Sequence, residues 1–101
     1  MGLLSFLFGS NSYKIKKYIK RGAIIIDVRT KDEYKSGAIE GSKHIPLDDL
    51  RNHVDDLKEL DKPIVVCCAS GVRSAKAAKY LNLNNIDAIN GGGWKSLKSH
   101  L

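Results

Sequence analysis

Two short runs of β-branched residues restrict the possible folds of this chain more than any other feature of its sequence. The first run, residues 23–28, reads AIIIDV and lies between Gly22 and a charged turn, and the second, residues 63–67, reads PIVVC. Neither run alternates between apolar and polar residues as a half-exposed strand does. Continuous apolar runs of this length are typical of parallel strands that are covered on both faces. We therefore expect two such strands.

Two patterns with helical spacing flank the second run. Before it, apolar side chains recur every three or four residues, which predicts an amphipathic helix whose apolar face is formed by Leu47, Leu50, Val54, Leu57 and Leu60. After it, the alanine-rich residues 74–83 predict a helix with one stripe formed by Ala75, Ala78 and Leu81.

Shorter signals complete the pattern of elements. Residues 12–20 predict a helix capped by Ser12, and Thr30 with Glu33 three residues later forms a capping box ahead of a short helix. Pro46 favours an extended segment before it, and residues 87–89 predict a third short strand. Because strands and helices alternate, the expected fold class is α/β, a three-layer sandwich with a mostly parallel sheet flanked by helices.

The length of 101 residues allows one compact core, since independent domains mostly have about 50 to 200 residues. We assign residues 12–101 to a single domain and residues 1–11 to an apolar N-terminal segment. That segment has no Lys or Arg before its apolar residues and is too short for a secretory signal or a transmembrane span. We expect it to dock on the domain or on a partner, with a membrane surface as the alternative, through Leu3, Leu4, Phe6, Leu7 and Phe8.

The net charge of +6 and the pI near 9.4 attract anions, whether these are small substrates, acidic proteins or nucleic acid. Most of the lysines are dispersed along the chain, which is typical of a solvated surface, so we expect no nucleic-acid partner. A content of 43% hydrophobic and 28% charged residues is that of an ordinary globular protein and excludes a disordered chain.

The two cysteines, Cys67 and Cys68, are adjacent and cannot form the long-range disulfides of a small secreted domain. We therefore expect a reducing compartment and place the protein in the cytoplasm. His44, His53 and His100 have no metal-ligand spacing among themselves or with the cysteines, so we assign no metal site and no cofactor.

Cys68 ends the second predicted strand and is followed by a turn of small residues and the start of a helix. Gly71 and its small neighbours let the backbone curl so that N–H groups point inward as an anion-binding nest. The helix adds the positive end of its dipole, and Arg73 adds a permanent cation. Comparable environments lower the pKa of a cysteine from about 8.5 to roughly 3.5–7.5. The sequence therefore predicts a nucleophilic thiolate.

This loop resembles the active-site loop of rhodanese-like sulfurtransferases, in which four residues separate a cysteine from an arginine and a small hydroxyl residue often follows. Cys68, Arg73 and Ser74 match that pattern. The resemblance extends over most of the chain through further landmarks in the family's order, namely Ile26-Asp27-Val28-Arg29, Glu33-Tyr34, Gly37-Ala38-Ile39-Glu40-Gly41-Ser42, Ile45-Pro46, Gly92-Gly93, Trp94 and Leu97.

The resemblance implies a sulfurtransferase of the thiosulfate:cyanide type, in which Cys68 carries sulfane sulfur as a persulfide. It implies that a small anionic donor such as thiosulfate binds to the loop residues Ala69, Ser70, Gly71, Val72, Arg73 and Ser74, and that a thiol or a protein cysteine accepts the sulfur. Arg73 is expected to brace the loop as well as to attract the donor. Asp27 and Arg29 are implied to form structural ion pairs and hydrogen bonds that hold the loops.

Some positions depart from the family's pattern. Ala38 stands where many members have histidine, Leu97 where many have an aromatic residue, and Ala69 where many have Arg or another polar residue after the cysteine. The loss of a polar side chain at Ala69 is expected to weaken thiosulfate binding or to change the preferred donor. Cys67 is expected to pack in the core, because side chains alternate across a strand, and an external acceptor must then discharge the persulfide.

Two other functions compete with sulfur transfer. A Cdc25-like phosphatase or arsenate reductase shares the fold and the position of the cysteine, but it has five residues between Cys and Arg, whereas this chain has four. A non-enzymatic rhodanese-like binding module is the second alternative, and the presence of Cys68 with Arg73 argues against it.

Overall fold

A four-stranded parallel sheet organises residues 11–101, the part of the chain that this computed structural model describes. Across the sheet the strands lie in the order β2-β1-β3-β4. Their bounds are β1 (Ile24–Asp27), β2 (Lys43–His44), β3 (Ile64–Cys68) and β4 (Ala88–Gly93). The two runs of β-branched residues form the central strands β1 and β3, where each strand has a neighbour on both sides. The prediction of two buried parallel strands is therefore confirmed.

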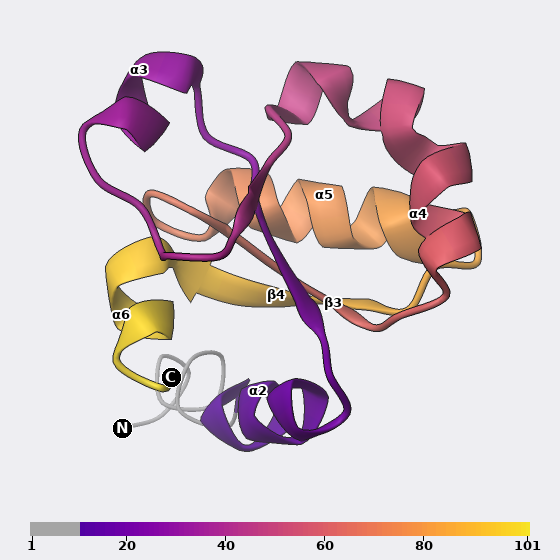
Figure 1. The fold of residues 1–101 in the computed structure, drawn as a ribbon, viewed down its shortest axis with the longest axis horizontal. Helices are drawn as coiled ribbons and strands as arrows, with labels where there is room; N and C mark the ends of the chain where they lie inside the picture. The colour runs from indigo at the N-terminus through magenta and orange to yellow at the C-terminus, as the bar shows by residue number, and fades with distance from the viewer. Residues whose placement is uncertain (1–10) are drawn as a thin grey trace.

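Helices cover both faces of the sheet (Figure 1). One face carries η2 (Leu47–His53), α4 (Val54–Leu60) and α5 (Val72–Leu83), and the other carries α2 (Asn11–Lys20) and α6 (Trp94–Lys98). The short helix α3 (Lys31–Lys35) follows β1 and begins with the capping box of Thr30 and Glu33. The predicted three-layer α/β sandwich with a parallel sheet is confirmed.

Strand β3 divides the core into two halves, because successive side chains of a strand point to opposite faces. All five of its residues are buried. Val66 and Cys68 pack with Leu81 of α5 on one face, whereas Val65 and Cys67 pack with residues of α2 and α6 on the other. The two sulfur atoms therefore lie on opposite sides of the sheet, as predicted.

The predicted helix over residues 47–60 is two elements rather than one. Its first half, η2, is a 3₁₀ helix, which matches the three-residue spacing between Leu47 and Leu50. Leu60 was assigned to the apolar face but is exposed, because it is the last residue of α4 and Asp61 ends the helix in a left-handed conformation. Likewise Ser12 does not cap α2, since that helix already begins at Asn11.

Helix α5 and strand β4 also differ from the prediction. Helix α5 begins at Val72, and its buried stripe consists of Ser74, Ala77, Ala78 and Leu81, whereas Ala75 is exposed. Strand β4 extends through its glycines to Gly93 and continues directly into α6, which was not predicted. Glycine is required at two positions of this strand because neighbouring atoms leave no room for a side chain. A Cβ on Gly91 would lie 2.6 Å from Val65 Cγ1, and one on Gly93 would lie 2.7 Å from the Ala69 carbonyl oxygen.

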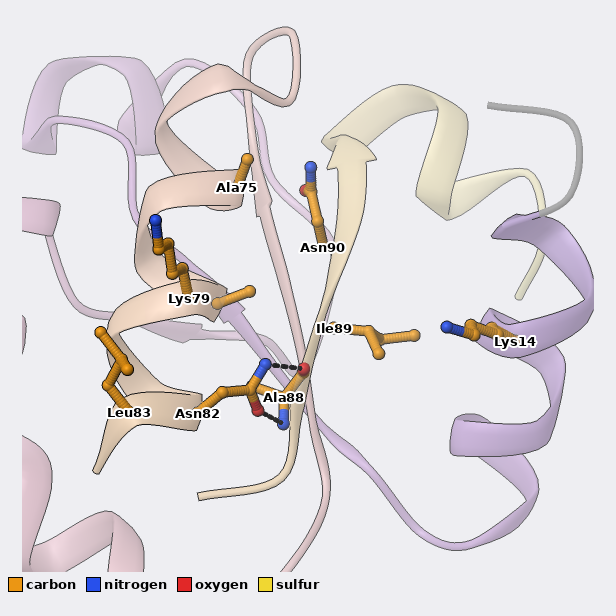
Figure 2. A pocket seen from close by; sticks show the side chains of 9 residues that line it. Lys14, Ala75, Lys79, Asn82, Leu83, Ala88, Ile89 and Asn90 are labelled. Carbon is orange, nitrogen blue, oxygen red and sulfur yellow. Dashed lines mark hydrogen bonds between the residues drawn. The ribbon is translucent and has the colours of Figure 1, made fainter. Parts of the chain in front are cut away.

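Strand β4 is an edge strand of the sheet, and a side chain of α5 forms hydrogen bonds with the backbone of its first residue. The Asn82 amide group donates to the Ala88 carbonyl and accepts from the Ala88 N–H, both at 3.0 Å, as Figure 2 shows beside the pocket that runs along this strand. Asn82 thus takes the place of a neighbouring strand at this position. Among residues 11–101, none of the helices has the length and apolar character needed to span a bilayer.

Candidate active site

Cys68 is the last residue of β3, and the chain turns sharply after it into α5. Gly71 makes this turn possible, since its φ of 101° lies in the left-handed region that favours glycine. A Cβ at this position would also lie 3.3 Å from Gly92 Cα, so the turn packs closely against the end of β4. The Cys68 side chain is 1% exposed and sits at the N-terminal end of α5.

Three donors converge on the Cys68 sulfur. The Gly71 N–H lies 3.0 Å from Sγ, the Ser74 N–H lies 3.4 Å away and the Ser74 hydroxyl lies 3.3 Å away. Burial by itself raises the pKa of Cys68, but hydrogen bonds from Ser74, Gly71 and Ser70 outweigh burial and lower the pKa below that of an ordinary thiol. The predicted nest and helix start are thus present, and they favour the thiolate.

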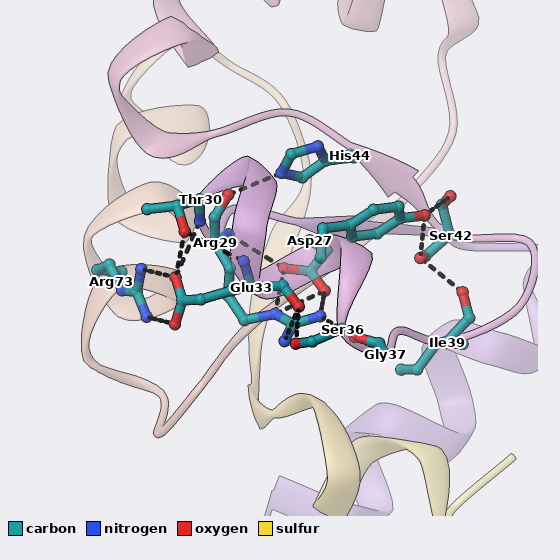
Figure 3. Close-up of polar contacts among 11 residues, drawn as sticks. Asp27, Arg29, Thr30, Glu33, Ser36, Gly37, Ile39, Ser42, His44 and Arg73 are labelled. Atoms are coloured by element: carbon teal, nitrogen blue, oxygen red, sulfur yellow. Dashed lines mark hydrogen bonds and ion pairs between the residues drawn. The ribbon is translucent and has the colours of Figure 1, made fainter.

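Arg73 ties the start of α5 to α3 (Figure 3). Its Nη1 donates to Glu33 Oε1 at 2.7 Å and its Nη2 to Oε2 at 2.9 Å, a two-point contact between guanidinium and carboxylate. Glu33 raises the pKa of Arg73, and the charge of Cys68 raises it further, so the guanidinium also interacts with the sulfur through its electric field. This contact joins the start of α5 to α3, and the expected roles of Arg73 in bracing the loop and attracting a donor stay predictions.

Asp27 and Arg29 form a buried ion pair at the end of β1 (Figure 3). Arg29 Nη2 donates to Asp27 Oδ2 at 2.7 Å and its Nε to Oδ1 at 2.9 Å. The same guanidinium donates to the carbonyl oxygens of Glu33 and Gly37 at 3.2 and 2.7 Å. It also stacks over the Trp94 ring at 4.8 Å. Arg29 therefore joins β1, α3, the following loop and α6.

A comparison with known protein families matches almost all of the residues that the structure describes. The family model described as the rhodanese-like domain matches residues 12–100. The chain belongs to the rhodanese-like family.

Individual members of the family are similar over most of this rhodanese-like chain. It is 38% identical over 77 residues to the uncharacterized protein YqhL of Bacillus subtilis, covering 74% of this chain and 60% of that protein. It is 32% identical over 78 residues to the thiosulfate sulfurtransferase GlpE of Pseudomonas fluorescens, covering 72% of this chain and 69% of that enzyme. The rhodanese-related protein of Thermoplasma volcanium has a similar structure, with a TM-score of 0.72, 32% identity and 87% of each chain covered.

The rhodanese-like chain is also similar to one part of a larger protein. The reduced Bacillus anthracis CoADR-RHD structure matches with a TM-score of 0.71 and 34% identity, covering 88% of this chain and 16% of that one. The chain therefore spans under two thirds of YqhL and a small part of CoADR-RHD.

Asn90 is a residue of this rhodanese-like domain that the sequence analysis missed, and it contacts two residues of the loop around the sulfur. It accepts a hydrogen bond from the Ser74 hydroxyl and donates one to the Gly71 carbonyl oxygen. Asn90 lies in β4, which neighbours β3 in the sheet. An Asn directly before three glycines at a predicted strand end was the available signal, because the carboxyl ends of parallel strands share one edge.

The other predicted positions have different surroundings. Cys67 is fully buried in the opposite half of the core, where burial first and the Asp27 charge second raise the pKa of its thiol to about 12. Ala69, Ser70 and Val72 are exposed on the loop. Within residues 11–101, no group of three or more His, Cys, Asp and Glu side chains could hold a metal ion. The N-terminal residues from Leu3 to Phe8 lie outside the described residues.

The pair of Glu33 and Arg73 makes the stability of this rhodanese-like domain depend on pH. The hydrogen bond from Arg73, followed by that from the Thr30 N–H, lowers the pKa of Glu33 to about 2. A carboxyl group with a depressed pKa stabilises the fold above its unfolded value of about 4.3, and this contribution is lost as the pH falls toward the folded pKa. Because both side chains are about one-third exposed, we expect a loss of about 1 kcal/mol between about pH 5 and pH 2.

Urea unfolding of the wild type and of Glu33→Gln at pH 7, 5 and 3 measures this contribution. We expect the variant to be less stable at pH 7 and the difference in unfolding free energy to shrink at pH 3. A difference that stays constant over this range would show that the Glu33 charge contributes nothing.

Proposed function

We propose that this rhodanese-like domain is a sulfurtransferase that carries sulfane sulfur as a persulfide on Cys68. The observation that carries the proposal is the convergence of the Gly71 N–H, the Ser74 N–H and the Ser74 hydroxyl on one sulfur atom at the start of α5. These donors stabilise an anion, which is the form of the nucleophile and also of a persulfide near neutral pH. The similarity to GlpE, a thiosulfate sulfurtransferase, supports the same reaction class.

In the first half-reaction, the Cys68 thiolate attacks the outer sulfur of a donor such as thiosulfate. A sulfur–sulfur bond forms to Cys68 while the bond to the donor breaks, and the donor leaves with that electron pair, as sulfite in the case of thiosulfate. The backbone of Ala69, Ser70, Gly71 and Val72 encloses the sulfur with Ser74, and Arg73 adds a positive field. Asp27 and Arg29 hold the surrounding loops in place without touching the donor.

In the second half-reaction, an acceptor nucleophile attacks the outer sulfur of the persulfide and releases the Cys68 thiolate. The acceptor is external, because Cys67 lies on the other side of the sheet with its pKa raised to about 12. We propose a small thiol or a protein cysteine as the acceptor, with cyanide as the laboratory equivalent. The two adjacent thiols, both free, fit a reducing compartment such as the cytoplasm.

The length of the loop favours sulfur transfer over phosphate hydrolysis. Only four residues separate Cys68 from Arg73, whereas Cdc25-like phosphatases have five, which gives their loop room to wrap a tetrahedral oxyanion. Sulfur transfer requires only that the outer sulfur of the donor reaches Cys68.

Parallel assays on thiosulfate with cyanide and on a phosphoaryl ester test the proposed function. We expect thiocyanate formation to exceed phosphate release by at least about a hundredfold in kcat/KM, a preference of about 3 kcal/mol in the transition state. A higher activity on the phosphoaryl ester would reverse the assignment, and activity on neither substrate, with no sulfur bound to Cys68, would favour a binding module.

A further inference from the structure

The side chain of Asn90 connects β4 to the loop that holds the sulfur. Its Nδ2 donates to the Gly71 carbonyl oxygen at 3.0 Å, and its Oδ1 accepts from the Ser74 hydroxyl at 2.6 Å. The Gly92 N–H donates to the same Oδ1 at 2.9 Å, which fixes the amide in one orientation. Asn90 thus binds the loop at two points, Gly71 in the tight turn and Ser74 at the start of α5.

The two residues that Asn90 contacts both donate hydrogen bonds to the Cys68 sulfur. Gly71 donates to Cys68 Sγ through its N–H, and Ser74 donates through its N–H and its hydroxyl. Ser74 is fully buried, so protein groups set the direction of its hydroxyl. We propose that Asn90 is a positioning residue of this site, which holds Gly71 and Ser74 where both donate to the Cys68 sulfur. Its importance for turnover rests on the proposed function of Cys68.

The Ser74 hydroxyl has one proton and two acceptors, Asn90 Oδ1 at 2.6 Å and Cys68 Sγ at 3.3 Å. While the sulfur is a neutral thiol, the Ser74 hydroxyl donates to Asn90 Oδ1, the nearer of the two acceptors. An anionic sulfur is a charge-assisted acceptor and draws the proton by rotation of the hydroxyl alone. Asn90 Oδ1 still accepts from the Gly92 N–H after this rotation. The site therefore responds to charge on the sulfur through rotation of one hydroxyl group, while its heavier atoms keep their positions.

The pH dependence of Cys68 alkylation by iodoacetamide tests this role, with mass spectrometry assigning the modified cysteine. In Asn90→Ala we expect the apparent pKa of Cys68 to rise by about 0.5 to 1.5 units, because its donors lose their support. Ser74→Ala should raise it as well. The double variant should shift by clearly less than the sum, since Asn90 acts in part through Ser74.

Asn82→Ala is the matched control for this experiment. Asn82 also bridges a backbone N–H and a carbonyl with its amide group, but it does so at Ala88, the first residue of β4, and contacts neither Gly71 nor Ser74 in the hydrogen bonds of its side chain. We expect this variant to lower the melting temperature without moving the Cys68 pKa. A purely structural role of Asn90 would give the same result as the control.

Two outcomes would overturn the positioning role. One is a folded Asn90→Ala variant whose Cys68 pKa stays within about 0.2 unit of the wild type, and the other is full additivity with Ser74→Ala. Should Asn90→Ala fail to fold, Asn90→Ser keeps a small polar side chain and adds no charge beside the sulfur. It should raise the pKa more than Asn82→Ser, and equal shifts would count against the role. Because alkylation requires no sulfur transfer, this result is separate from the outcome of the activity assays.

Discussion

Sulfur transfer from thiosulfate to cyanide is expected to fall by at least about a thousandfold when Cys68 is replaced by serine. The serine hydroxyl is not ionised near neutral pH and forms no persulfide. The substitution removes the sulfur but keeps a small polar side chain for the donors of Gly71 and Ser74, so the fold should persist. The rate of thiocyanate formation measures the effect, and a circular dichroism melt of the same sample checks the fold.

Cys67→Ala is the control for this experiment. Its thiol lies in the opposite half of the core, on the far side of the sheet from the Cys68 sulfur. We expect a modest loss of stability and a rate within a few-fold of the wild type. Persistent activity in Cys68→Ser would show that Cys68 is not the reactive cysteine. Loss of activity in a folded Cys67→Ala variant would show that Cys67 takes part in the reaction.

The largest loss of stability is expected from breaking the buried pair of Asp27 and Arg29. The side chains are 0% and 4% exposed, and Arg29→Met leaves the Asp27 carboxylate buried without its cation. Removal of one partner of a buried ion pair typically costs about 3–5 kcal/mol. The variant also leaves the carbonyl oxygens of Glu33 and Gly37 without their donor. In a domain of ordinary stability, about 5–15 kcal/mol, this change removes a large part of the total.

Arg21→Met provides the comparison on the surface. Arg21 forms an ion pair with Asp87 at 3.0 Å, but these side chains are 53% and 49% exposed. We expect a much smaller loss of stability in urea unfolding than for Arg29→Met, because water screens an exposed ion pair. Combining Arg29→Met with Asp27→Leu should recover part of the stability, because both charges are then removed together. Equal losses for Arg29→Met and Arg21→Met would mean that the buried pair has no special role.

The architecture was predictable because it depends on patterns local in sequence. The β-branched runs produced the central strands, and the capping box of Thr30 and Glu33 formed as expected. The errors lie where packing decides the outcome. The third strand was predicted to end at residue 89, yet β4 continues through the glycines to Gly93. A Cβ on Gly91 or Gly93 would lie too close to Val65 or Ala69, so only glycine fits at these two positions.

In the candidate site, too, the features that are local in sequence could be predicted, and the contacts between distant residues could not. The position of Cys68 before a glycine turn and a helix start could be predicted, since these features are adjacent in sequence. The pairing of Arg73 with Glu33, 40 residues away, could not be derived from spacing. The contacts of Asn90 with Gly71 and Ser74 were equally hidden, because they depend on the order of the strands in the sheet. Contacts of this kind connect the loop around Cys68 to α3 and to β4.

The intact mass of the protein after incubation with thiosulfate, followed by removal of the excess donor, is the most direct test of a persulfide carrier. We expect the mass to rise by one sulfur atom, the added atom to map to Cys68 in peptide spectra, and cyanide to return the protein to its original mass. An unchanged mass, or an added sulfur that maps to Cys67, would contradict the proposal that Cys68 carries the sulfur.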